Sequence, residues 1–98
     1  PLEQALQSIA HLIESVYPRY RCAISLLSPD RSSLRLMVAA SLPPRLRAVL
    51  DDSAIDLRRG TCAAALYLGR AVVAADIATD PYSTERRDIL LEAGIRAM

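Results

Sequence analysis

The sequence predicts a mixed α/β (α+β) domain in which helices flank an antiparallel central sheet. Helical periodicity runs through residues 2–16, and two alternating apolar segments, 21–28 and 34–39, enclose a turn-rich stretch. Three glycines divide the second half of the chain into short helical and extended pieces. A chain of 98 residues is long enough for one small domain, so we expect residues 1–98 to form a single unit.

The first element is expected to be a helix over residues 2–16. Its apolar residues are spaced by four, three, four and three positions, close to a heptad pattern, and they are Leu2, Leu6, Ile9, Ile13 and Val16. The helix is predicted to end at Tyr17-Pro18, since proline disfavours helical geometry in the residue before it. The stripe can pack on the sheet or form the seam of a homodimer, and its spacing favours a role in dimerisation.

The two alternating segments predict an antiparallel hairpin. Each segment carries apolar side chains at every second position, and a stretch rich in turn-forming residues joins them. The inward-facing residues are expected to be Cys22, Ile24 and Leu26 in the first strand and Leu34, Leu36 and Val38 in the second.

The second half of the chain is predicted to contain three short helices. Their expected N-terminal caps are Ser41, Thr61 and Ser83, because a side-chain oxygen at this position can accept a bond from an unpaired helical N–H. The second and third of these helices are expected to end at Gly69 and Gly94, since glycine readily adopts the left-handed conformation.

Extended or irregular segments connect these helices. Residues 71–75 are an apolar run that predicts a strand buried on both faces, and residues 95–98 are expected to begin another strand. Residues 53–59 are expected to be extended or a loop, and residues 76–82 a loop.

The composition excludes several classes of partner. The 12 basic residues, all arginine, nearly balance the 11 acidic ones, so a net charge of +1 gives no basic surface for nucleic acid or a membrane. The chain has no Phe or Trp, so it offers few platforms for stacking bases. Two cysteines in apolar surroundings, with no signal segment and no membrane-spanning run, predict a reducing, cytoplasmic location.

Several segments, in the same order along the chain, resemble the GAF domain, a small-molecule-sensing module of signalling proteins that is similar in fold to PAS sensors. The main one runs from Gly60-Thr61-Cys62-Ala63-Ala64-Ala65 through Asp76-Ile77 to Asp80-Pro81. Cys22–Leu27, Leu34–Pro43 and Gly94–Ala97 resemble further segments of the family. The chain departs from the family at Ala63-Ala64, where Gly-Thr is common. The resemblance also stops before the family's last strands, so residues beyond Met98 or a partner chain are expected to complete the sheet.

The resemblance implies a regulatory sensor domain of a bacterial signal-transduction protein, such as a sensor histidine kinase, a diguanylate cyclase or a transcription activator. The domain itself is expected to be no enzyme, to bind a small molecule of unknown identity and to form a homodimer. A ligandless dimerisation module is the alternative. A free methionine sulfoxide reductase is less favoured, because the stretch 80–85 lacks the second thiol that such chemistry needs.

The candidate ligand-binding residues are Arg59, Thr61, Cys62, Tyr67 and Asp76. The first amides of the helix after Gly60 lack internal partners and suit an anionic or carbonyl group of a ligand, although an ordinary helix cap is the favoured interpretation. A thiol at a helix start can have a lowered pKa, but a small buried apolar role is favoured for both cysteines.

No catalytic or metal-binding residues are predicted. His11, the one histidine, falls on the polar side of the first helix, and no further ligands converge with it. Asp76, Asp80 and Asp88 occupy turn or surface positions, where a structural role is favoured over acid–base catalysis.

Overall fold

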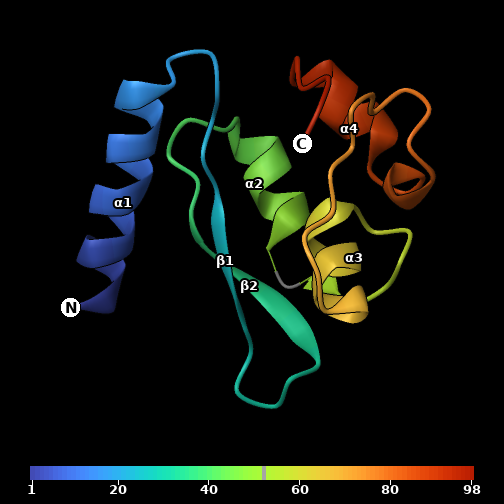
Figure 1. Ribbon diagram of the computed structural model, residues 1–98. Helices are drawn as coiled ribbons and strands as arrows, with labels where there is room; N and C mark the ends of the chain where they lie inside the picture. Colours follow the sequence, from blue (N-terminus) through green and yellow to red (C-terminus); the bar gives the residue numbers. More distant parts are fainter. Residues whose placement is uncertain (52) are drawn as a thin grey trace.

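The computed structural model describes residues 1–51 and 53–98, which form four α-helices, a 3₁₀ turn and a three-stranded antiparallel sheet (Figure 1). This confirms the mixed α+β fold class. In chain order the elements are α1 (Leu2–Val16), β1 (Ile24–Leu27), β2 (Ser33–Val38), α2 (Pro44–Leu50), β3 (Ser53–Ala54), α3 (Thr61–Leu68), the 3₁₀ turn η1 (Pro81–Ser83) and α4 (Arg87–Glu92).

The sheet has the order β1-β2-β3, so β1 is an edge strand. The predicted hairpin is confirmed, with Leu27 opposite Leu34 next to the turn. An irregularity between Ile24 and Ser25 shifts the register, and Leu26, expected to face inward, is exposed. A bulge adds a residue on one strand and changes which face the following side chains occupy, which the regular alternation could not predict.

The hairpin separates two parts of the molecule. Helix α1 lies on one side of it and contacts β2, whereas α2, α3 and α4 lie on the other side (Figure 1). The buried core is on this second side and comprises residues of α2, of the preceding loop, of the 74–77 segment and of α4: Ala39, Leu42, Leu46, Ala74, Ile77 and Leu90. No helix among the described residues is both long enough and apolar enough to cross a membrane.

Three expected helix caps are wrong. Helix α2 follows Pro43, α3 follows Gly60 and α4 follows Arg86, and none of the three has a side-chain capping bond. The hydroxyls expected to cap bond elsewhere, because tertiary or turn partners lie closer. Ser41 donates to Glu14 and Ser83 to Asp80 Oδ2 at 2.6 Å, while Thr61 Oγ1 donates to Met98 Sδ at 3.8 Å.

The expected helix ends at Gly69 and Gly94 are confirmed. Gly69 follows α3 with φ 69° and ψ 28°, in the left-handed region that glycine adopts without steric cost. Gly94 also has a positive φ, 83°, and follows the end of α4.

The prediction of a strand at 71–75 buried on both faces is wrong. Only Ala74 is buried, and Val73 is 78% exposed. The segment is extended, but it lies outside the three-stranded sheet and pairs with the end of the chain instead. Ala74 and Met98 exchange two backbone hydrogen bonds of 2.7 and 2.9 Å, and the Ile77 N–H donates to the Arg96 carbonyl. Residues 96–98 therefore run antiparallel to the 74–77 segment, but neither segment is among the three strands of the sheet, so the strand expected to begin at 95–98 is not formed.

Helix α1 is attached to the hairpin by one carboxylate. Ala10 is its only buried residue, so apolar packing holds the helix weakly. Glu14 Oε2 accepts bonds from the Cys22 N–H, at 2.9 Å, and from the Ser41 hydroxyl. These bonds, that from Ser41 first and that from Cys22 second, lower the pKa of Glu14.

We predict that Glu14→Ala lowers the melting temperature by a few degrees at neutral pH and that this difference shrinks in acid. A carboxyl group whose pKa is lower in the folded protein than in the unfolded chain stabilises the fold at pH values above its unfolded-state pKa. That stabilisation is lost as the pH falls from near 4.5, the ordinary pKa of the group, through the lower pKa that Glu14 has in the folded protein. Thermal melts of both proteins between neutral and acid pH measure the difference. Glu3→Ala, on the exposed start of the same helix, is the matched control. A difference that does not change with pH would contradict the carboxylate's role.

Candidate functional site

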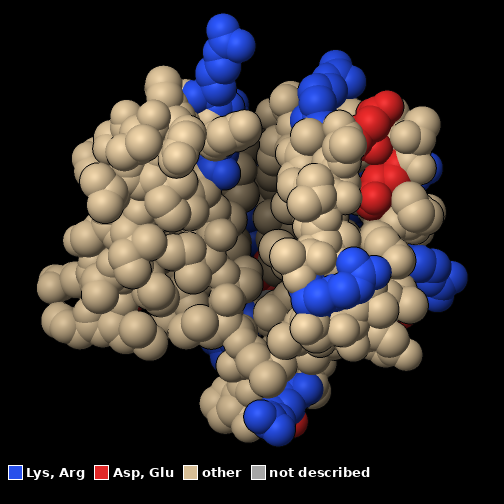
Figure 2. Space-filling view, in the orientation of Figure 1, with Lys and Arg blue, Asp and Glu red and all other residues tan. Residues whose placement is uncertain are grey.

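A cleft of about 800 Å³ opens between the hairpin side of the molecule and the α3 side. Figure 2 shows the hollow between the surface over α1 and the hairpin and the surface over α3 and α4, with arginine atoms at its upper end. Its walls come from the segment before β1, from β1 and β2, from the start of α3 and from residues 94–98. Such a volume matches the size of pockets that hold small organic molecules.

The floor of the cleft is mainly apolar. Its leucines come from β2, α2 and α4 and from the loop before α2, and they are Leu34, Leu36, Leu42, Leu50 and Leu90. A second, more open hollow of about 590 Å³ continues along the edge strand β1, between Ala23–Ser25 and the α3 residues Cys62, Ala65 and Leu66. Ala63 and Ala64 of the same helix are buried and do not line this second hollow.

The structure brings together three of the five candidate ligand-binding residues. Arg59, Thr61 and Cys62 line the cleft, since they belong to the loop before α3 and to its first turn. Tyr67 and Asp76 do not line it. The Tyr67 side chain is on the outer part of α3 and is 62% exposed, and Asp76 Oδ1 accepts the Ala78 N–H at 3.0 Å in a turn.

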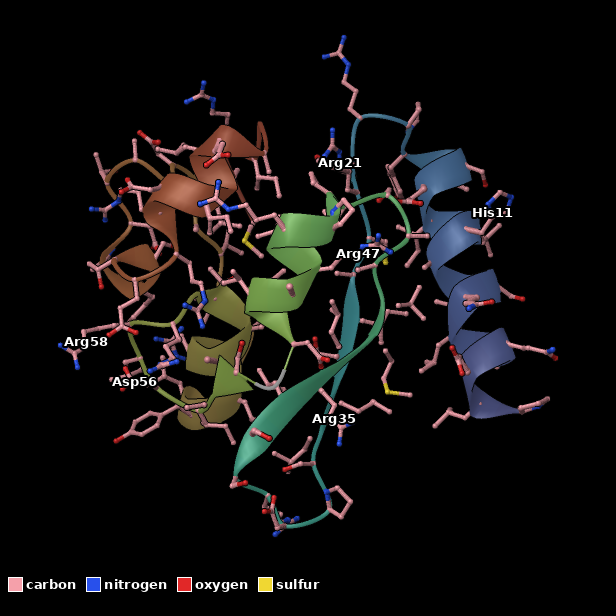
Figure 3. All side chains as sticks on the ribbon, turned by 180° about the vertical axis from the view of Figure 1, so that it is seen from behind. His11, Arg21, Arg35, Arg47, Asp56 and Arg58 are labelled. Atoms are coloured by element: carbon pink, nitrogen blue, oxygen red, sulfur yellow. The ribbon has the colours of Figure 1, made fainter. Side chains whose placement is uncertain are left out.

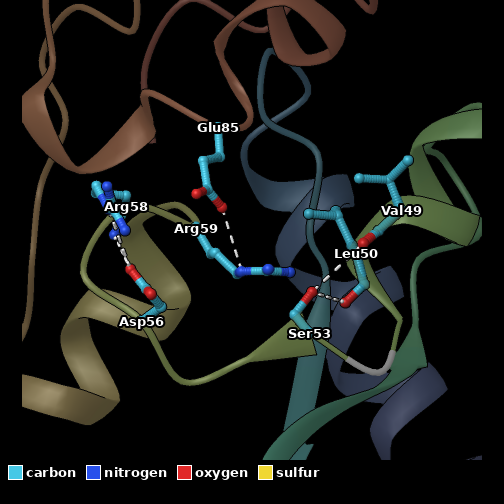
Figure 4. A network of polar contacts seen from close by, with 7 residues as sticks. All are labelled: Val49, Leu50, Ser53, Asp56, Arg58, Arg59 and Glu85. Atoms are coloured by element: carbon cyan, nitrogen blue, oxygen red, sulfur yellow. Dashed lines mark hydrogen bonds and ion pairs between the residues drawn. The ribbon is translucent and has the colours of Figure 1, made fainter.

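Ion pairs fix the loop that leads into α3 (Figure 4). Arg59 Nε lies 3.2 Å from Glu85 Oε2, which joins the loop to the segment before α4. Asp56 Oδ1 accepts the Arg58 N–H at 2.9 Å and lies 3.7 Å from Arg58 Nε. The Arg58 N–H, followed by the charges of Arg58 and Arg59, lowers the pKa of Asp56. The loop is thus shaped by local charge pairs that leave Arg59 at the cleft wall.

Cys62 is exposed at the cleft wall, so the interpretation of this residue as a small buried apolar group is wrong. The protein atoms crowded around its sulfur nevertheless raise the pKa of the thiol, because they disfavour the thiolate. Cys22 is half-buried, and burial followed by the charge of Glu14 raises its pKa as well. At neutral pH both side chains are therefore thiols, which are poor nucleophiles.

Sequence reasoning missed three cleft arginines: Arg19, Arg21 and Arg96. The first two precede β1, and the third lies near the other end of the chain. No local motif connects them, because only the fold brings residues 19–21 and 96 to the same cleft. Figure 3 shows Arg21 at the connection between α1 and β1.

Helix α1 carries a second candidate surface. Four of its apolar side chains are at least half exposed: Leu2 (60%), Ile9 (50%), Leu12 (62%) and Val16 (59%). We call these four residues the α1 face. Leu6, part of the predicted seam, is instead half-buried, and Ile13 is 38% exposed. The helix is rotated so that Ala10 faces the hairpin and most of the predicted seam faces away from it.

No group of three His, Cys, Asp or Glu side chains in the described part of the chain is arranged to hold a metal ion. His11 is exposed on the outer side of α1, as expected for a surface residue (Figure 3).

Comparison with known proteins gives one informative similarity. No protein-family model and no solved structure matches the chain. Among curated proteins, a methyl sulfide methyltransferase-associated sensor of Methanosarcina acetivorans is 24% identical over 96 residues. The match covers 98% of this chain and 10% of the relative, so the chain spans about one tenth of that protein's length. A relative named as a sensor is compatible with a sensory role at a coarse level.

We predict that alkylation of Cys62 is slow at neutral pH and accelerates only at high pH. Because the protein atoms around the sulfur desolvate the thiolate and raise the pKa of Cys62 above the ordinary 9.0, the rate profile should have its midpoint above that value. The measurement is the rate of iodoacetamide labelling against pH in the Cys22→Ser variant, which isolates Cys62. Free cysteine under the same conditions is the control. A midpoint below 9.0 would show an activated thiol and contradict the structure.

Proposed function

We propose that this chain is a GAF-like regulatory sensor domain that binds a small molecule in the cleft. The single observation that carries the proposal is the cleft itself, an open volume with an apolar floor and polar walls that Arg59, Thr61 and Cys62 help to line. The order of helices and strands and the similarity to a protein named as a sensor support it. An open cleft favours a ligand-binding domain over a ligandless module, in which side chains would fill this space.

The proposed domain forms a homodimer through the α1 face. Leu2, Ile9 and Val16 are seven residues apart and exposed together, which is the spacing of a helix–helix seam. Leu12 widens this surface, and no charged side chain interrupts it. A second copy of α1 offers a matching apolar surface, as a two-fold interface requires.

The cleft and the α1 face are coupled in this proposal through the segment that joins α1 to β1. Residues 19–21 and Ala23 line the cleft, and the Cys22 N–H between them donates to Glu14 on α1. A ligand that contacts this segment favours one position of it, and Glu14 transmits that position to the dimer helix. Two packings of α1 with different ligand affinities are sufficient for a sensor.

The proposal places the chemistry of the response elsewhere in a longer signalling protein, such as a kinase, a cyclase or a transcription activator, located in the cytoplasm. The chain itself is proposed to be no enzyme. The raised pKa values of Cys22 and Cys62 argue against the alternative thiol-based reductase, because that reaction begins with a thiolate.

We predict that a small-molecule ligand raises the melting temperature of the protein in a saturable, dose-dependent way. A ligand that binds only the folded state stabilises it by mass action. Thermal-shift measurements with anionic, neutral and cationic metabolites test this. Thr61→Leu, which fills the cleft wall, should abolish the shift, whereas the exposed Thr79→Leu should preserve it. A protein that responds to no compound of any class would contradict the sensor proposal and favour the ligandless module.

We predict that Ile9→Asp converts a dimer into a monomer without unfolding the domain. Ile9 is 50% exposed in the isolated chain, so a carboxylate there is tolerated in the monomer but desolvated at an apolar interface. Light scattering after size exclusion gives the mass, and circular dichroism gives the helix content. Gln7→Asp, exposed on the polar side of α1, is the matched control. A monomeric wild-type protein, or a dimeric Ile9→Asp variant, would contradict the assignment of the α1 face.

A further inference from the structure

The cleft carries an unbalanced charge. Its lining contains four arginines, Arg19, Arg21, Arg59 and Arg96, and no aspartate or glutamate among the described residues. The whole chain has 12 basic and 11 acidic residues, so this imbalance does not follow from the net charge. The fold places these positive charges in one hollow, where walls of low dielectric strengthen their field.

The four arginines differ in how many hydrogen bonds and ion pairs their side chains already make within the protein. Arg59 pairs with Glu85 at 3.2 Å, and Arg21 Nη1 donates to the Ala93 carbonyl at a long 3.5 Å. The side chains of Arg19 and Arg96 make no hydrogen bond or ion pair with the described residues. Both are exposed residues of the cleft lining, one before β1 and one after α4, so their guanidinium donors remain available to a ligand.

A fifth arginine adds positive charge behind the cleft wall. Arg86 packs beside Gly60, and its Nε atom is buried without a hydrogen-bond partner in the described part of the chain. Burial and the neighbouring charge of Arg59 lower the pKa of Arg86. Glu85 pairs with Arg59, and its charge acts on the pKa of Arg86 in the opposite direction, although the net shift of that pKa is still downward. An additional negative charge near Arg59 would relieve the remaining repulsion.

The remaining lining favours a molecule with an apolar body over a free inorganic ion. Leucines from β2, α2 and α4 form the floor, and the volume of about 800 Å³ is far larger than a hydrated anion needs. The hydroxyls of Ser25, Ser53 and Thr61 and the thiol of Cys62 are the remaining polar groups from the sheet and α3. Ser53 Oγ already donates to the Leu50 carbonyl at 2.8 Å (Figure 4).

We propose that the cleft selects an organic anion, a small carboxylate or phosphate ester whose apolar body lies on the leucine floor. Arg19 and Arg96 bind the charged group, because the planar guanidinium matches the two oxygens of a carboxylate or phosphate. A cationic ligand would meet four arginines and no aspartate or glutamate among the described residues that line the cleft. This inference rests on the proposed function, since it names the ligand class of the same cleft.

The test is calorimetric titration of the 98-residue protein with four probes that share one apolar body: hexanoate, hexyl phosphate, hexanamide and hexylamine. We expect at least one anion to bind about tenfold or more tightly than the amide and the amine, as a charge-assisted bond contributes about that much. The tighter of the two anions identifies the carboxylate or the phosphate class. Binding of the anion should weaken with added salt.

Variants locate the anion. The double variant Arg19→Gln/Arg96→Gln should lower the affinity of the tighter anion about tenfold or more. Arg35→Gln removes an exposed arginine of β2 that does not line the cleft, and it should leave the affinity unchanged (Figure 3). Circular dichroism of each variant establishes that the fold is retained.

Three results would overturn the proposal: equal binding of hexanamide or hexylamine, full affinity in the double variant, or no binding of either anion. These failures are separable from failure of the sensor proposal. A neutral or cationic compound that binds in the thermal-shift series would overturn the anion inference and keep the sensor. The absence of binding in every class would overturn both.

Discussion

The arrangement of this domain depends on the bonds that Glu14 accepts. Helix α1 buries one residue, Ala10, so hydrophobic packing alone gives it little reason to lie where it does. The carboxylate of Glu14 accepts bonds from Cys22 and Ser41, which belong to the connections at either end of the hairpin. One side chain thus positions α1, the entry to β1 and the segment before α2 relative to one another. It also leaves the α1 face exposed and fixes the wall that carries Arg19 and Arg21.

The cleft exists because the core is built to one side of it. The buried residues of α2, the 74–77 segment and α4 pack among themselves, and the start of α3 lines the opposite wall of the cleft from β1. The edge strand β1 and residues 96–98 therefore face a common hollow without filling it. A cleft of this size with an apolar floor and an arginine-lined wall is suited to ligand binding.

The sequence predicted those parts of the fold in which the local pattern and the tertiary environment agree. The helical spacing of apolar residues predicted the 15-residue helix α1, and the alternation of apolar and polar residues predicted the β1–β2 hairpin. The helix caps failed because the hydroxyls of Ser41, Thr61 and Ser83 have partners outside the helix start. The strand at 71–75 failed because an apolar run indicates burial only where a second layer covers it, and here only Ala74 is covered. Whether the sheet continues after Met98 stays a prediction.

The candidate site divides in the same way. Arg59, Thr61 and Cys62 are neighbours in the sequence, so a motif could find them, and they do line the cleft. Tyr67 belongs to the same motif, but its side chain lies on the outer part of α3 and is exposed. The cleft arginines before β1 and after α4 could be found only after folding, because residues far apart in the sequence supply them.

The central claim is that the cleft binds a ligand and that Glu14 couples it to α1. Residue-resolved ¹H–¹⁵N spectra recorded during a hexanoate titration test this most directly. The account predicts shifts at the cleft residues 19–23, 59–63 and 94–98 that continue through Glu14 into α1, and a loss of the α1 shifts alone in Glu14→Ala. Shifts scattered over the outer surface, or cleft shifts that leave α1 unchanged in the wild-type protein, would contradict it.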